Sequence, residues 1–120
     1  MAIRGNTKTL SLTVTAKRAR ARGELLVQAP AAALPPAVER AAAGLDRMTL
    51  TGLWQERAEF SAGTTWKSFG QDIVLSFEPV DAGTTRVVAT STPVVATTLL
   101  DYGQSKADLT QILGAVAAQL

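Results

Sequence analysis

Apolar and polar residues alternate in several short segments of this 120-residue chain. Between positions 9 and 15, for example, Leu10, Leu12 and Val14 alternate with serine and threonine. This period of two is typical of a β-strand with one buried and one exposed face. The same pattern predicts strands over 9–15, 48–54, 57–62, 72–77 and 85–91.

The segment 24–29 allows two interpretations. Its residues Leu25, Leu26 and Val27 favour a second strand, paired as a hairpin with the strand over 9–15. The segment is short, however, and it also fits a lead into the helix that follows. A basic stretch and Gly23 separate it from the first strand.

Two segments have the 3.6-residue period of helices that bury one face. The first, near 35–45, begins with Pro35 and Pro36, which suit a first helical turn because their missing N–H groups have no helical partner there. The second, near 104–119, starts with Ser105 and Asp108, which resemble a capping box. The apolar stripes comprise Leu34, Val38, Ala41, Ala42 and Leu45 in the first helix and Leu109, Ile112, Leu113, Val116 and Leu120 in the second.

This order of elements predicts one α+β domain over residues 1–120. We expect a two-layer sandwich, with an antiparallel sheet of about five or six strands and both helices on one face, because the connections are short. Half of the TATA-box-binding protein and the helix-grip lipid-binding domains have a similar order, which bears on fold alone. The predicted core comprises Leu12, Val38, Leu50, Phe60, Ile73, Leu75, Val88, Leu109, Ile112 and Val116.

Composition removes several kinds of chemistry. The chain is 47% apolar and 18% charged and contains neither Cys nor His, so disulfides, thiolate nucleophiles and the commonest general base and zinc ligand are absent. None of the remaining nucleophiles lies in a nucleophile elbow, a P-loop or a dinucleotide fingerprint. We therefore expect a protein that is not an enzyme and has no cofactor and no metal site.

The chain also shows no targeting segment. Its start lacks an apolar signal region, and no stretch approaches the roughly 20 apolar residues that span a bilayer. We therefore expect a cytoplasmic protein without a membrane partner.

Two short motifs resemble those of a family of small bacterial domains of unassigned function. Those domains carry a Ser-Trp-Gly-Glu turn before a central strand and an Asp-Trp-Gly turn before the last helix. The corresponding segments here are Ser68-Phe69-Gly70-Gln71 and Asp101-Tyr102-Gly103, with Gly83-Thr84 and Ser91-Thr92-Pro93 between them. The resemblance covers about 45–120 and implies a fold but no chemistry.

This sequence departs from the family pattern at three positions. Phe69 and Tyr102 replace the two Trp residues, and Gln71 replaces the Glu. A catalytic role for that Glu would therefore be lost in this chain.

We interpret the two turns as a structural clasp in which Ser68–Gln71 and Asp101–Gly103 meet in space. Gly70 and Gly103 permit backbone angles closed to other residues, and Asp101 is the expected acceptor for backbone N–H groups at the helix start. The alternative is a ligand site. In that case Trp66 and the two turns, together with Trp54 and Phe60, line a pocket between sheet and helices.

Charge is unevenly distributed along the chain. Six basic residues precede the first acid, Glu24, and give +6, while the remainder carries six basic and ten acidic residues and has a net charge of −4. The densest basic segment contains Lys17, Arg18, Arg20 and Arg22. It could contact the phosphates of a nucleic acid, but a solvated hairpin tip explains it more simply.

Together these features predict a non-catalytic binding or assembly module that forms homo-oligomers. An Ala-rich helix face and exposed strand edges are common materials of small homodimers. The first alternative is a carrier of a small apolar ligand, of the helix-grip type. Nucleic-acid binding through the basic segment at 17–22 ranks third.

Overall fold

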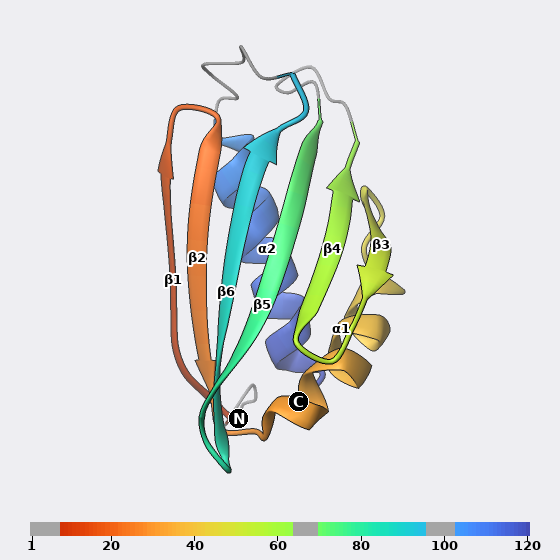
Figure 1. Cartoon of the computed structure of the whole chain (residues 1–120). Coiled ribbons are helices and arrows are strands. Elements are labelled where there is room, and N and C mark those ends of the chain that lie inside the picture. Colours follow the sequence, from red (N-terminus) through yellow and green to blue (C-terminus); the bar gives the residue numbers. More distant parts are fainter. Residues whose placement is uncertain (1–7, 64–69, 96–102) are drawn as a thin grey trace, which may run out of the picture.

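The computed structural model describes residues 8–63, 70–95 and 103–120, which form a single six-stranded sheet and its helices (Figure 1). All neighbouring strands are antiparallel, in the order β1-β2-β6-β5-β4-β3. In chain order the elements are β1 (Thr9–Lys17), β2 (Arg20–Val27), the short 3₁₀ helix η1 (Ala31–Ala33), α1 (Leu34–Ala42), β3 (Met48–Leu53), β4 (Arg57–Ala62), β5 (Gln71–Asp81), β6 (Thr84–Pro93) and α2 (Gln104–Ala118).

Both α-helices cover the same face of the sheet, as Figure 1 shows. Helix α2 packs along β2, β1 and β6, whereas α1 packs against β3, β4 and α2. The predicted α+β class, two-layer arrangement and antiparallel sheet are therefore confirmed. Neither helix in the described ranges is both long and apolar enough to cross a bilayer.

The predicted hairpin between the first two strands is present. β2 begins at Arg20, earlier than predicted, so part of the basic segment lies within the strands and not between them. A two-residue turn, Arg18–Ala19, joins β1 to β2, and Arg18 has a positive φ of 59°. Gly23 lies inside β2, where an added Cβ would come within 2.7 Å of Leu113 Cδ1, so a residue without a side chain allows α2 to approach the strand closely.

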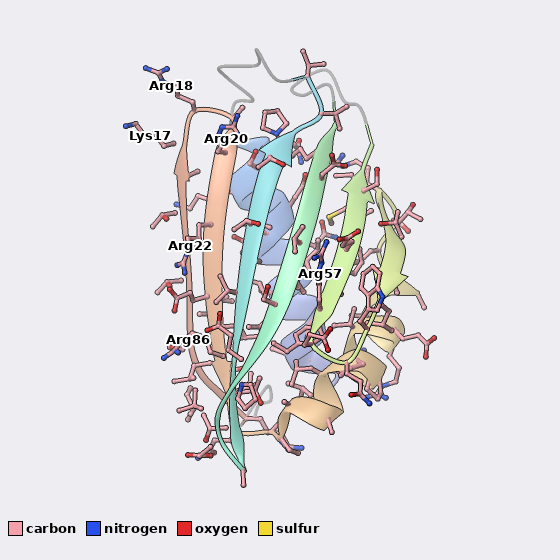
Figure 2. All side chains as sticks on the ribbon, in the orientation of Figure 1. Lys17, Arg18, Arg20, Arg22, Arg57 and Arg86 are labelled. Carbon is pink, nitrogen blue, oxygen red and sulfur yellow. The ribbon has the colours of Figure 1, made fainter. Side chains whose placement is uncertain are left out.

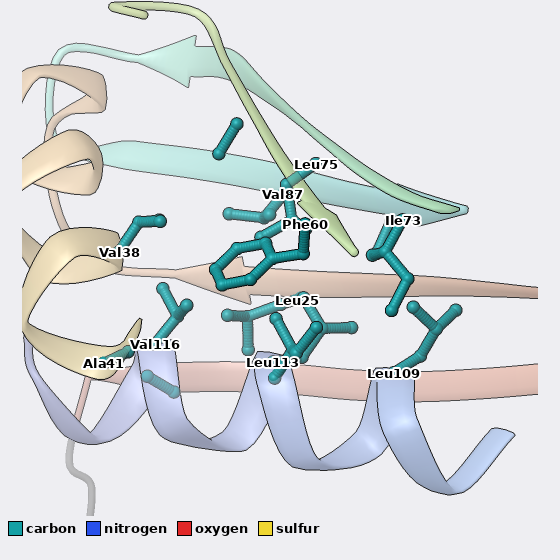
Figure 3. Packing of buried hydrophobic residues seen from close by; sticks show 14 of the residues in the cluster. Leu25, Val38, Ala41, Phe60, Ile73, Leu75, Val87, Leu109, Leu113 and Val116 are labelled. Carbon is teal, nitrogen blue, oxygen red and sulfur yellow. The ribbon is translucent and has the colours of Figure 1, made fainter. Parts of the chain in front are cut away.

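Phe60 is the largest fully buried side chain and lies between the sheet and α2 (Figure 3). Seven predicted core residues are buried: Val38, Phe60, Ile73, Leu75, Leu109, Ile112 and Val116. Leu50 is half-buried and packs against this core. The core thus lies between the sheet and the helices and is formed by residues of both, as the strand period of two and the helix period of 3.6 residues predict.

The core assignments of Leu12 and Val88 are wrong, for different reasons. Leu12 faces the helix side of β1, opposite Leu25, but β1 is an edge strand that the helices cover only partly, and Leu12 is 37% exposed. Val88 lies on the open face with Arg86, because Val87 pairs with Phe77 and faces the helices. Because Val87 and Val88 are adjacent valines, the sequence is compatible with either of them facing the helices. A shift of one residue in the strand pairing exchanges the two faces of the strand.

This register is testable with two isosteric substitutions. Val87→Thr places a hydroxyl in the fully buried interlayer and should lower the free energy of unfolding by about 1 to 3 kcal/mol. Val88→Thr, the matched control on the open face, should change it by less than about 0.5 kcal/mol. Urea denaturation measures both values, and equal losses would contradict the register.

Candidate functional site

A buried carboxylate lies at the centre of a polar cluster at one end of the sandwich. Asp108, on α2, accepts hydrogen bonds from three side chains. Arg47 Nη2 lies 2.5 Å and Gln104 Nε2 2.8 Å from Asp108 Oδ1, and Gln71 Nε2 lies 2.8 Å from Asp108 Oδ2. Both oxygens of this buried carboxylate therefore have donors, as a buried charge requires.

The cluster extends through Gln71 and Arg47 to the sheet. Gln71 Oε1 accepts a hydrogen bond from Ser91 Oγ, and Arg47 Nη1 donates to the carbonyl oxygen of Gly63 at 2.8 Å. We call Arg47, Gln71, Ser91, Gln104 and Asp108 the polar cluster. It joins the connection between α1 and β3, the starts of β5 and α2, and the ends of β4 and β6.

The hydrogen bonds of the polar cluster fit a structural role. The hydroxyl of Ser91 donates to an amide oxygen, which is not a base that could activate it. Asp108 is ion-paired with Arg47 and buried beneath it. Within 8–63, 70–95 and 103–120, no group of three or more acidic residues could hold a metal ion.

Three of the seven predicted clasp residues lie in the described ranges: Gly70, Gln71 and Gly103. Both glycines have positive φ, 100° at Gly70 and 83° at Gly103, the angles for which glycine is favoured. Gln71 is hydrogen-bonded to Asp108 of α2, the helix that begins directly after Gly103. The other four, Ser68, Phe69, Asp101 and Tyr102, lie outside the described residues, as does Trp66 of the alternative ligand site, so the clasp between the two turns stays a prediction.

The predicted capping box at the start of α2 is wrong. Gly103 is the N-cap residue, and no side chain caps it. Ser105 Oγ instead donates to the carbonyl oxygen of Ala19 at 2.7 Å, which ties the β1–β2 turn to α2. Ser105 and Asp108 fall on the buried stripe of α2 with Leu109 and Ile112, so tertiary contacts compete with the local caps.

The four basic residues of the segment 17–22 divide into two groups (Figure 2). Arg22 forms an ion pair with Glu24 on the same strand, at 2.5 Å. Lys17, Arg18 and Arg20 are exposed at the end of the hairpin and form no ion pair with any described residue. We call these three residues the basic tip.

Further along the open face, opposite charges are paired. Arg86 lies 3.4 Å from Glu24 and 3.9 Å from Glu78, so an ion-pair row crosses β2, β6 and β5. The hydrogen bond from Arg22 is the main reason that the pKa of Glu24 is lowered, and the charges of Arg22 and Arg86 add to it. The folded protein thus gains stability from the ionised form of Glu24, and this gain is lost as the pH falls through its lowered pKa.

Trp54 lies on the open face of the sheet and not in a pocket under the helices. Its ring lies against Gly52, and the Arg57 guanidinium lies 5.5 Å from the ring centroid, a cation–π distance. Phe60, the other described aromatic of the predicted pocket, is part of the core. A hollow of about 390 Å³ opens instead at the surface beside η1, lined by Ala31, Ala32, Pro35 and Gln55.

The sequence did not reveal the link between Arg47 and Asp108. They are 61 positions apart, and Arg47 lies in a short connection with no periodic pattern. The one available signal was the presence of an acid within the apolar stripe of α2, since a charge there needs a partner.

The polar cluster makes a prediction about Gln71. In Gln71→Glu, a second buried carboxyl group faces Asp108 in place of an amide donor, which should lower the free energy of unfolding at neutral pH by about 2 to 4 kcal/mol. The neighbouring charge and burial raise the pKa of the introduced group in the folded state, so protonation favours folding. The deficit relative to the wild type should therefore shrink as the pH falls from 7.5 to about 5. Denaturation at both pH values measures it, and a deficit that grows at acidic pH would refute the assignment.

Comparison with known proteins adds no family to this description. No protein-family model matches the chain, and no curated protein matches its sequence.

Proposed function

We propose that the protein is a non-catalytic, cytoplasmic assembly module that forms homodimers through the free edge of β1. The observation that carries the proposal is the character of this edge. β1 spans nine residues, has no charged residue from position 9 to 16 and exposes 48% of Leu10 and 37% of Leu12. Natural proteins protect such edges, because backbone groups on an open edge readily pair with another strand.

The two edges of the sheet differ in this respect. β3, the opposite edge, has six residues, and a bulge between Leu50 and Gly52 interrupts its pairing with β4. β1 has one irregularity, between Thr9 and Ser11, and then pairs continuously with β2 as far as Lys17. A short or bulged edge discourages intermolecular pairing, whereas a long regular edge supports it.

A second copy of the chain suits this edge. Two β1 strands related by a twofold axis run antiparallel, and each supplies the same uncharged surface to the other. Leu12 and Val14 then meet their counterparts on the helix side, while Ser11, Thr13 and Thr15 meet on the open side. The two basic tips point in opposite directions, so they do not repel each other across the interface.

We favour assembly over the carrier of a small apolar ligand. Large side chains occupy the space between sheet and helices, among them Phe60, Leu113 and Ile73, each buried against its neighbours (Figure 3). A carrier of this type needs an apolar hollow in the same place.

Sedimentation equilibrium at high micromolar concentration tests the proposal. We expect the wild type to have twice the mass of one chain and Leu12→Lys to be a monomer, because a charge on an edge strand blocks pairing. Since Leu12 is partly exposed, the free energy of unfolding should change by less than about 1 kcal/mol.

The matched control is Thr49→Lys, which places the same charge on the exposed surface of β3. It should remain dimeric. A wild type that is monomeric, or a dimer that Leu12→Lys leaves intact, would overturn the β1 interface.

A further inference from the structure

We propose that the end of the sandwich carrying the basic tip docks on an anionic lipid surface, with the cations at the headgroups and two exposed valines at the edge of the acyl region. This inference is independent of the β1 interface. It departs from the expectation of no membrane partner, which rested on the lack of a membrane-spanning segment and not on surface contacts. It rests on cations that have no acidic partner among the described residues and on exposed apolar side chains at the same end of the sheet.

The basic tip concentrates positive charge at one point. Lys17 and Arg20 are register partners on neighbouring strands, and Arg18 lies in the turn between them (Figure 2). Lys106 is an exposed residue of α2 next to Ser105, whose hydroxyl contacts the turn. Four cations, three from the β1–β2 hairpin and one from α2, thus lie at this end.

These cations lack acidic partners in the described ranges, unlike the other arginines of the sheet. Arg22, Arg57 and Arg86 each have a carboxylate partner. Directly opposed like charges on paired strands are destabilising, and the pair of Lys17 and Arg20 is of this kind. A negatively charged surface attracts both cations and so offsets their mutual repulsion. The free energy of binding to an anionic partner is therefore favourable.

Exposed apolar side chains lie at the same end of the sheet. Val94 and Val95 follow directly after β6 and are 56% and 40% exposed. β6 pairs with β2 up to Ser91 opposite Ala21, so the valines lie beyond the paired region, beside the turn end of the hairpin. The N–H of Val94 donates to the carbonyl oxygen of Gly70 at 3.1 Å, which holds this segment against the start of β5.

The combination distinguishes a lipid surface from a nucleic acid. Cations attract both partners, but aliphatic side chains gain free energy only where they leave water, as at the boundary of the acyl chains. Non-specific binding of a DNA duplex uses cations alone, and binding of a single strand adds aromatic stacking platforms. Val94 and Val95 offer no such platform, so a lipid surface uses both the cations and the valines of this end, whereas a nucleic acid uses the cations only.

Co-sedimentation with lipid vesicles tests the proposal. The wild type should bind vesicles of mixed phosphatidylglycerol and phosphatidylcholine at an ionic strength of about 0.1 M, more weakly as salt rises. It should bind pure phosphatidylcholine weakly. Each of Lys17→Gln and Arg20→Gln should reduce the partition coefficient about fivefold, and Val94→Ser combined with Val95→Ser should also reduce it.

Two further variants separate binding from folding and from net charge. Arg18→Gly should raise the melting temperature, because glycine suits the positive φ at this position, while it weakens vesicle binding. Arg86→Gln removes one charge from the paired region of the open face and should leave binding within about twofold, since it contributes no free cation to the tip.

Three results would overturn the proposal: equal binding to neutral and anionic vesicles, tip variants that bind like the wild type, or tighter binding to a short DNA duplex than to anionic vesicles. Leu12→Lys keeps the tip and both valines, so it should still bind vesicles. Loss of vesicle binding and loss of dimerisation can therefore be told apart.

Discussion

Burial of the Asp108 carboxylate within the apolar stripe of α2 constrains one end of this fold. Once Leu109 and Ile112 are packed against the sheet, Asp108 is removed from water with them, and a charge there is tolerated only with hydrogen-bonding partners. Arg47 and Gln71 supply them from two segments far apart in the sequence. The same contacts hold the connection before β3 and the start of β5 against α2. Attachment of the connection before β3 and of the start of β5 to α2 thus depends on a single buried carboxyl group.

The sheet has one covered and one open face, and this asymmetry determines which surfaces are available to partners. Helix α2 packs on β1, β2 and β6 and helix α1 packs on β3 and β4, but the edge strand β1 is covered only partly. On the open face, Arg86 forms ion pairs with Glu24 and Glu78. Partner surfaces are therefore expected at the margins of the sheet, where charge or apolar area is left without a counterpart, and the two proposed surfaces lie at such margins.

The edge and the tip belong to the same hairpin but offer different interactions. The edge of β1 offers backbone hydrogen bonds and uncharged side chains, which suit an identical strand. The tip offers long-range charge, which falls off within a Debye length and responds to salt. Ser105 joins the two to the body of the protein, since its hydroxyl fixes the turn to α2. Assembly and surface docking can accordingly be changed by separate substitutions.

Local periodicity was enough to determine most of the element types and most of the core, because Phe60, Ile73 and Leu109 each lie on a clearly alternating or helical pattern. It left 24–29 open between a strand and a lead into the helix, and pairing with both β1 and β6 makes it part of β2. It could not decide which of Val87 and Val88 faces inward, since the register depends on the pairing with β5. It placed Leu12 in the core because a pattern does not reveal that a strand lies at an edge. Ser105 and Asp108 looked like local caps, and only the packed helix showed that both side chains are buried and bonded to distant segments. Periodicity reports which face of an element is apolar, whereas the partners of that face are decided by packing between segments far apart in the chain.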